Sequence, residues 1–266
     1  MYVDSHCHLS FPELSAKLDD IRADMQAAGV DRALCICTTL EEFDQVHRLA
    51  THYDNFWASA GVHPDNEDVL EPSVDDLVAL AAKPRVVAIG ETGLDYYRLN
   101  GRSIADMEWQ RERFRVHIRA SRLSGKPLVI HTRSASADTL QVLREEGGGQ
   151  ARGVFHCFTE TMEVARAALD LGFLISFSGI LTFKTAVDLR EVARYVPLDR
   201  CLIETDSPYL APVPFRGKTN TPAYVPYVAK QIAELKDVSL EQVAVATSSN
   251  FERLFGVPPL KESSHD

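Results

Sequence analysis

Six histidine and carboxylate side chains follow short apolar segments that are spread over the whole chain. The first segment runs into His6-Cys7-His8, and later segments run into Glu91, His131, His156 and Asp206. Imidazole nitrogens and carboxylate oxygens are the ligands that proteins offer to divalent transition metals. Because alternate residues of an extended chain point to the same side, His6 and His8 can reach one cation while Cys7 points away. The spacing predicts a metal site.

A single histidine at a strand end is more often a hydrogen-bonded structural residue than a ligand. Six such residues at one edge are different, because buried imidazoles and carboxylates without partners are costly unless they share a cation. One cation rarely uses four imidazoles and two carboxylates while it keeps a position open for substrate. Two cations bridged by a carboxylate and a hydroxide, about 3.5–4 Å apart, would use all six ligands. We therefore expect two divalent cations per chain.

The identity of the metal stays open at this point. Four imidazoles suit zinc, manganese, cobalt or nickel by ligand type, whereas magnesium prefers oxygen ligands and water.

Short apolar segments alternate along the chain with longer amphipathic stretches. Val, Ile, Leu, Ala and Cys dominate the short segments, as they do in buried strands of parallel sheets. The pattern predicts eight strands, at 2–4, 33–38, 56–61, 86–90, 128–130, 153–155, 174–178 and 201–203. Between and after them it predicts nine helices, near 13–28, 40–53, 72–82, 107–124, 134–146, 160–171, 184–195, 222–235 and 239–254.

Strands that alternate with helices form either a closed (β/α)8 barrel or an open doubly wound sheet. Eight such units in 266 residues, without a Gly-x-Gly-x-x-Gly motif after an early strand, favour the (β/α)8 TIM barrel. We expect a single domain over residues 1–266. In such a barrel the active site lies at the C-terminal ends of the strands, so the metal site should lie there.

Composition limits the classes of partner and compartment. Twenty-eight basic and 38 acidic residues give a net charge of −10, which argues against broad electrostatic binding to DNA. A local patch or bound cations could still hold a phosphate. Five scattered cysteines indicate reduced thiols. Because there is neither a secretory signal nor an apolar run long enough for a membrane span, we expect a cytoplasmic protein without membrane contact.

The segment 207–226 after the last predicted strand contains five of the 13 prolines and the cations Arg216 and Lys218. A long loop of this kind often covers or lines a site, although closure of the barrel explains it as well.

Several motifs resemble those of the TatD-type metal-dependent deoxyribonucleases, within the amidohydrolase superfamily. The resemblance covers nearly the whole chain, in order and with matching spacing, and is close to bacterial TatD-like hydrolases with an Arg216-Gly217-Lys218 loop. The motifs are Val3-Asp4-Ser5-His6-Cys7-His8, Gly61-Val62-His63-Pro64, Gly90-Glu91-Thr92-Gly93-Leu94-Asp95-Tyr96, His131-Thr132-Arg133, His156-Cys157-Phe158 and Glu204-Thr205-Asp206-Ser207-Pro208.

The resemblance implies a role for each of the six candidate ligands. His6 and His8 would hold one metal with Asp206 beside them, Glu91 would bridge both metals, and His131 and His156 would hold the second. None of the six positions departs from the family pattern. The resemblance also implies magnesium- or manganese-supported exonucleolytic cleavage of DNA from 3′ to 5′.

Other residues near the predicted strand ends are candidates for substrate binding. His63 would contact phosphate or support the site, and Glu204 would orient a ligand or help to bind cation. Arg133 and Asp95 would take substrate or supporting roles. Arg216 and Lys218 would hold a phosphate. Tyr96 and Tyr97 would stack an unpaired base or line the barrel mouth.

We expect a hydrolase that acts on ester bonds: a deoxyribonuclease that trims single-stranded DNA ends with a metal-bridging hydroxide. Asp206 would be the catalytic base. The alternative is a hydrolase of a small ester, lactone or amide that uses the same centre. A non-catalytic partner protein is disfavoured because every expected ligand is present, and nothing in the sequence indicates an obligate protein partner.

Overall fold

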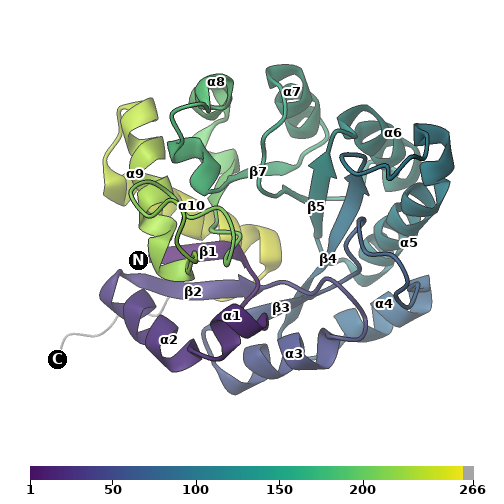
Figure 1. Ribbon diagram of the computed structural model, residues 1–266, viewed down its shortest axis with the longest axis horizontal. Coiled ribbons are helices and arrows are strands. Elements are labelled where there is room, and N and C mark those ends of the chain that lie inside the picture. Colours follow the sequence, from purple (N-terminus) through teal and green to yellow (C-terminus); the bar gives the residue numbers. More distant parts are fainter. Residues whose placement is uncertain (260–266) are drawn as a thin grey trace.

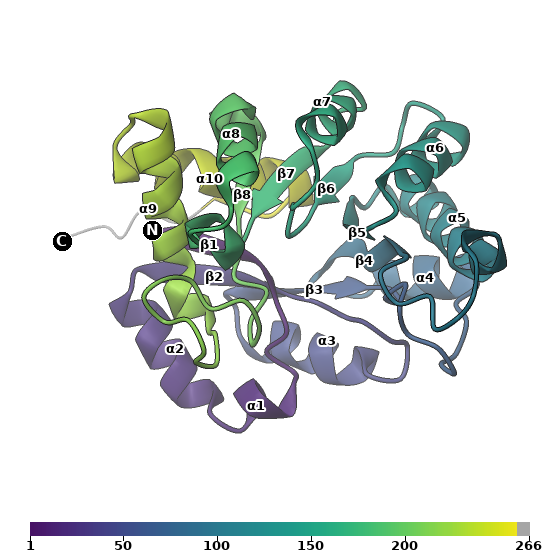
Figure 2. The same ribbon diagram turned by 45° about the horizontal axis from the view of Figure 1, so that its top comes forward.

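The computed structural model describes residues 1–259. Eight parallel strands follow one another around a single sheet in chain order, and helices surround the sheet (Figure 1; Figure 2). The strands are β1 (Tyr2–Cys7), β2 (Val30–Cys35), β3 (Phe56–Ala60), β4 (Val86–Asp95), β5 (Leu128–Arg133), β6 (Gly153–Phe155), β7 (Leu174–Phe177) and β8 (Cys201–Ile203). This is the (β/α)8 barrel that the sequence predicts.

Helices lie between successive strands, and two more, α9 and α10, follow the last strand. They are α1 (Pro12–Ser15), α2 (Leu18–Ala27), α3 (Phe43–His52), α4 (Val74–Ala81), α5 (Glu108–Ser124), α6 (Ser136–Gly147), α7 (Met162–Asp170), α8 (Val187–Tyr195), α9 (Val225–Lys236) and α10 (Leu240–Phe255). Short 3-10 turns lie at Ile104–Met107, Gly179–Thr182, Leu198–Arg200 and Pro222–Tyr224. Ser239 and Gln242 form a capping box at the start of α10.

Several expectations about element boundaries are wrong, among them those for β1, which extends to Cys7, and β2, which covers Val30–Cys35. The single helix expected over 13–28 is two helices, because the chain leaves helical geometry at Lys17. The strands β4 and β5 run further than the apolar segments, and Asp95 pairs with Arg133 at their ends. Polar residues continue these strands because their side chains face the rim of the barrel, where partners replace the apolar core.

The core has two layers, one on each face of the sheet. Alternate strand residues, among them Leu34, Val87 and Val129, form an inner cluster with Phe251 and Phe255 of α10. The residues of opposite parity pack outward against the surrounding helices. The inner apolar layer therefore supports the polar residues at the C-terminal ends of the strands.

The barrel closes between β1 and β8 through side chains as well as backbone. His8 N donates to Ser207 O at 2.9 Å, and Asp206 N donates to His6 O at 2.9 Å. The buried Asp4 side chain of β1 binds Thr205, which lies between β8 and Asp206 in the chain. Its oxygens accept hydrogen bonds from Thr205 N at 2.9 Å and from Thr205 Oγ1 at 2.5 Å. Asp4 thus supplies acceptors between strands that share only one isolated bridge, at Cys7 and Ser207.

All five cysteines are free thiols, and four of them are buried, as expected for core residues. Over residues 1–259, none of the helices combines the length and the apolar character that crossing a bilayer requires.

Candidate metal centre

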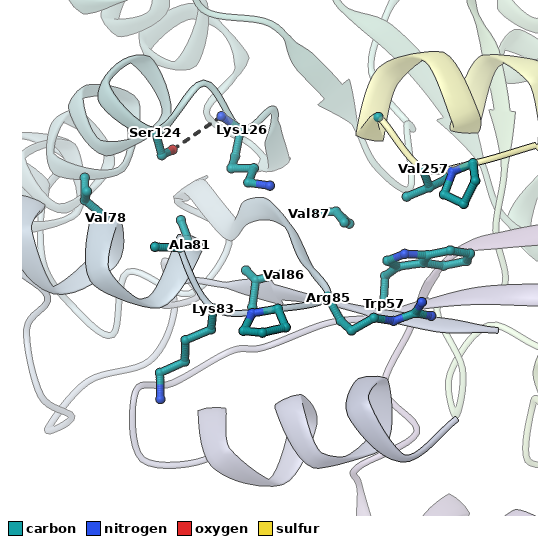
Figure 3. A pocket seen from close by; sticks show the side chains of 14 residues that line it. Trp57, Val78, Ala81, Lys83, Arg85, Val86, Val87, Ser124, Lys126 and Val257 are labelled. Carbon is teal, nitrogen blue, oxygen red and sulfur yellow. Dashed lines mark hydrogen bonds between the residues drawn. The ribbon is translucent and has the colours of Figure 1, made fainter. Parts of the chain in front are cut away.

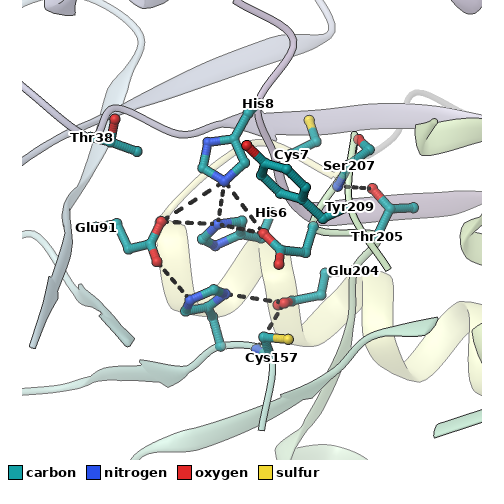
Figure 4. A network of polar contacts seen from close by, with 12 residues as sticks. His6, Cys7, His8, Thr38, Glu91, Cys157, Glu204, Thr205, Ser207 and Tyr209 are labelled. Carbon is teal, nitrogen blue, oxygen red and sulfur yellow. Dashed lines mark hydrogen bonds and ion pairs between the residues drawn. The ribbon is translucent and has the colours of Figure 1, made fainter. Parts of the chain in front are cut away.

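The barrel brings all six predicted ligands to the same end, around the carboxylate of Glu91. Figure 4 shows the part of this group that contains His6, His8 and Glu91. One oxygen, Glu91 Oε2, lies 3.3 Å from His6 Nε2 and 3.9 Å from His8 Nε2. The two imidazole Nε2 atoms are 3.3 Å apart. Asp206 Oδ1 completes this group, at 3.6 Å from His6 Nε2 and 3.4 Å from His8 Nε2.

The other oxygen of Glu91 faces a second group of nitrogens. Glu91 Oε1 lies 2.9 Å from His156 Nε2, 3.3 Å from His131 Nδ1 and 3.3 Å from His63 Nε2. The expected pairing of His131 and His156 on one side of Glu91 matches this arrangement. His63, which was expected as a substrate contact or supporting residue, lies equally close.

The spacing of these atoms fits cation binding. Ligands at about 2.0–2.1 Å from a tetrahedral cation are separated from one another by about 3.3–3.4 Å. The distances around Glu91 Oε2 lie between 3.3 and 3.9 Å. Two imidazole lone pairs at such a distance repel unless a proton or a cation lies between them. The residues present therefore fit a shared divalent cation on each side of Glu91.

Two carboxylates set which nitrogen each histidine turns toward Glu91. Asp95 Oδ2 lies 3.0 Å from His131 Nε2, and Glu204 Oε1 lies 3.2 Å from His156 Nδ1. Each carboxylate accepts the ring N–H, so that the opposite nitrogen keeps its lone pair for a cation. The sequence left two roles open for each of these carboxylates. The geometry favours the supporting role for Asp95 and the orientation of a ligand for Glu204.

His63 has a different protonation pattern from the other histidines. Its Nδ1 atom accepts a hydrogen bond from the backbone N–H of Asp65 at 3.1 Å. In the neutral ring the proton must then be on Nε2. This N–H group points at Glu91 Oε1 as a hydrogen-bond donor, so Nε2 has no lone pair to offer to a cation. The geometry supports an N–H donor at the edge of the centre.

The carboxylates of the centre are ionised in this environment. Burial opposes the ionisation of Glu91, but the imidazoles of His156, His63 and His6 hold its pKa well below the ordinary value. Burial likewise opposes the ionisation of Asp206, and its hydrogen bond with His8 and the nearby rings of His6 and His156 lower its pKa. Both groups can therefore attract cations at neutral pH.

Asp4 is a residue of the site that the sequence analysis did not single out. Its Oδ1 accepts a hydrogen bond from the backbone N–H of His6 at 3.2 Å, in addition to its bonds with Thr205. Asp4 therefore holds the strand that carries His6 against the segment that carries Asp206. A carboxylate inside an apolar strand, two residues before a ligand, was the available signal.

Glycines allow β4 to approach its neighbours closely. A Cβ atom on Gly93 would lie 1.9 Å from the carbonyl oxygen of His131, and the residue has a φ of +130°. A Cβ atom on Gly61 would lie 2.5 Å from the carbonyl carbon of Gly90. A side chain at Gly93 would separate the strands that carry Glu91 and His131, and one at Gly61 would separate the end of β3 from β4.

The centre opens into a cavity of about 620 Å³. Of the substrate-binding candidates, His63, Arg133 and Asp95 line it. The sequence analysis missed several lining residues because they lie on loops without a recognisable pattern, namely Phe11, Thr38, Asn66, Arg98, Ile180, Tyr209 and Leu210.

Arg216 and Lys218 do not belong to this lining. Both are exposed, and the Arg216 guanidinium lies 3.6 Å from the ring centre of Phe183. A contact of these cations with phosphate would have to form outside the cavity, and it stays a prediction.

The two candidate stacking tyrosines differ. Tyr96 is buried, and its hydroxyl is held by Asp138 at 2.8 Å and Arg111 at 2.9 Å. The expectation that Tyr96 stacks a base is therefore wrong, because its ring is packed inside the fold. Tyr97 is 58% exposed and remains accessible.

A second cavity of about 420 Å³ lies at the opposite end of the barrel (Figure 3). Trp57, Lys83, Arg85 and Lys126 line it, without any of the candidate ligands. The other four histidines lie outside both cavities or the described residues: His117 is buried in α5, His47 and His52 lie on α3, and His265 is outside the described residues.

Comparison with known proteins agrees with this centre. The family model described as TatD related DNase matches residues 3–256. The chain is 50% identical over 259 residues to "Uncharacterized metal-dependent hydrolase YcfH" of Escherichia coli (strain K12), covering 96% of each protein. The chain belongs to the TatD family. Like those relatives, it is a metal-dependent hydrolase.

Two further TatD relatives extend the comparison. The chain is 36% identical over 245 residues to "3'-5' ssDNA/RNA exonuclease TatD" of Citrobacter rodentium, covering 90% of this chain and 92% of that protein. The crystal structure of the TatD homologue YJJV from Escherichia coli K12 superposes with a TM-score of 0.87 at 26% identity, covering 97% and 98% of the chains.

Proposed function

We propose that this TatD-family hydrolase is a deoxyribonuclease that removes nucleotides from the 3′ ends of single-stranded DNA. The observation that carries the proposal is the division of Glu91 between two groups of ligands, with 3.3 Å from Oε2 to His6 Nε2 and 2.9 Å from Oε1 to His156 Nε2. Such a double centre is typical of enzymes that hydrolyse phosphate esters with two cations. The name of the Citrobacter relative supports the choice of substrate.

His6, His8, Glu91 and Asp206 would hold one cation, and Glu91, His131 and His156 the other. Bound there, two divalent cations would lower the pKa of a water molecule and stabilise negative charge on the phosphoryl oxygens. We expect zinc, manganese or magnesium, since the imidazoles favour the first two by ligand type.

Asp206 acts as the general base in this proposal. Its carboxylate is ionised, and Oδ1 lies 3.6 Å from His6 Nε2 and 3.4 Å from His8 Nε2. Oδ2 accepts the proton of the attacking water as the new P–O bond forms. The bond from phosphorus to the 3′ oxygen of the remaining strand breaks, and that oxygen receives the proton.

His63 donates a hydrogen bond in the same step. Its Nε2–H lies at the cavity wall, 3.3 Å from Glu91 Oε1. An N–H fixed at this position can bind a nonbridging phosphoryl oxygen as its charge increases. His63 would thus be a substrate contact rather than a ligand of the cation.

The test uses oligodeoxynucleotides labelled at the 5′ end, as single strands and as duplexes, with manganese, magnesium or zinc. We expect a ladder of shortened, still labelled single strands and release of 5′-mononucleotides. Glu91→Gln is the matched control, because it removes the shared charge at nearly constant shape. A panel of small esters, lactones and amides runs in parallel. Turnover of that panel without any cleavage of DNA would replace the proposal by the small-substrate alternative.

A further inference from the structure

The mouth of the cavity has one aromatic side. The Phe11 ring stacks on His8 with centroids 4.6 Å apart, and it meets the Tyr209 ring edge-on at 6.4 Å. Tyr209 is 54% exposed, and Figure 4 shows it beside His8 and directly above the ligand group. Ile180 and Leu210 continue this side of the lining. An exposed aromatic surface therefore adjoins the ligands His8 and Asp206.

The opposite side of the mouth is cationic. Arg98 and Arg133 are the only Lys or Arg residues in the described lining of the cavity. The Arg133 guanidinium lies 3.6 Å from the ring centre of Tyr97. Tyr97 is itself held to the centre, because its backbone N–H donates to Asp95 Oδ1 at 2.8 Å while Asp95 Oδ2 binds His131. The stack therefore fixes the Arg133 charge relative to the second ligand group.

These two arginines lack the ion pairs that seven of the 20 arginines form. Arg102, Arg113 and Arg119 each form an ion pair with a glutamate. Within residues 1–259, neither Arg98 nor Arg133 has a carboxylate within ion-pair distance. In a chain of net charge −10, two uncompensated guanidinium groups beside an acidic centre are suited to bind an anionic group of a ligand.

The position of Arg133 along β5 fixes which part of a ligand it reaches. His131 and Arg133 are alternate residues of this strand, so they point to the same side and are about 6.6 Å apart along it. Arg133 would therefore not bind the part of the ligand that reacts at Glu91. It would bind the part next to it.

We propose that the mouth is a nucleotide slot: Tyr209 and Phe11 stack one unpaired base, and Arg133, assisted by Arg98, binds the phosphate adjacent to the reacting one. This inference rests on the proposed nuclease function and names the residues that select a nucleic-acid strand. Aromatic stacking accepts any base, and it requires that the base be unpaired. The slot therefore selects single strands without reading their sequence.

The experiment measures binding, so that it does not depend on turnover. Manganese-loaded protein is titrated into a fluorescein-labelled oligodeoxythymidine with phosphorothioate linkages, which resist hydrolysis, and anisotropy is followed at several salt concentrations. Metal content is measured for every variant, and comparisons are made at equal loading.

Each wall has its own variant and matched control. Tyr209→Leu should weaken binding about fivefold to a hundredfold with an unchanged salt slope, whereas Tyr209→Phe, which keeps the ring, should bind like the parent. Arg133→Gln should weaken binding and reduce the slope of log K against log salt by about 0.7, the contribution of one phosphate contact on a single strand. Arg22→Gln removes an arginine stacked on Tyr53 at 4.0 Å, away from the cavity, and should change neither quantity.

The outcomes separate this inference from the function on which it rests. If the parent protein binds and trims the single strand but Tyr209→Leu and Arg133→Gln bind it as tightly with the same slope, the slot is refuted and the nuclease function stands. If the parent neither binds nor trims any oligonucleotide, the proposed function itself fails.

Discussion

His117 provides a quantitative test of how the fold holds the end of β3, next to His63. The ring is fully buried: its Nε2 accepts a hydrogen bond from Val62 N at 3.0 Å, and its Nδ1 donates to Arg113 O at 2.8 Å. Both nitrogens are used by the neutral ring, so an added proton would break the bond with Val62. Burial accordingly lowers the pKa of His117 from 6.5 to about 4.

The sign of the resulting pH dependence follows from the lowered pKa. As the pH falls below 6.5, the unfolded chain takes up a proton on His117 while the folded chain does not, so stability is lost between the ordinary value and about 4. At about 1.36 kcal/mol per pKa unit, this residue removes about 2 kcal/mol of the free energy of unfolding between about pH 7.5 and pH 5.

The matched variant is His117→Gln, whose amide can donate and accept but does not titrate. Urea unfolding of both proteins is measured from about pH 7.5 to pH 5 at one saturating metal concentration, so that the other titrating groups contribute equally to both. We expect the variant to lose about 2 kcal/mol less than the parent over this interval. The two proteins may differ in stability at about pH 7.5, since the prediction concerns only how that difference changes down to about pH 5. Profiles that stay parallel over the interval would refute the assignment of a buried neutral ring.

Three further predictions concern the metal centre. Elemental analysis at saturating metal should give about two divalent cations per chain. Glu91→Gln should lower the occupancy of both positions together. If this variant lost only one cation, that would contradict a shared carboxylate. Asp206→Asn should keep much of its metal and lose at least about a hundredfold in kcat on DNA, and a near-normal kcat at full occupancy would move the base to another residue. Asp4→Asn replaces one oxygen of the buried carboxyl group that accepts hydrogen bonds from His6 and Thr205, so calorimetric metal titration should show weaker binding at the position of His6 with that of His131 unchanged. Equal losses at both positions would contradict this local role.

The sequence by itself was sufficient for the fold and for expecting that the six candidate ligands lie together. Strand and helix periodicities are local properties, and eight alternating units leave few ways to bury their apolar faces. The relation between His6 and His8 is likewise local, since alternate strand residues face one side, and their Nε2 atoms are indeed 3.3 Å apart. Residues at the ends of parallel strands must meet at one rim whatever the details of packing.

The sequence was weaker wherever a residue's role depends on a partner far away in the chain. Arg133 and Arg216 both stack on an aromatic ring at 3.6 Å, yet only Arg133 lines the cavity. Tyr96 and Tyr97 are neighbours in sequence, and the structure buries the first and exposes the second. No local pattern distinguishes the members of either pair.

Only the tertiary structure decided how the two oxygens of Glu91 are divided between ligand groups, and how Asp4 joins the first strand to the segment after the last. These contacts link residues up to about two hundred positions apart, as with Asp4 and Thr205, whose separation is 201. Their distances depend on how the barrel closes and on the close strand contact at Gly93, where a Cβ would come within 1.9 Å of His131 O. Hydrogen bonds and metal ligation require atomic distances correct to a few tenths of an ångström, whereas periodicity specifies only the face on which a residue lies.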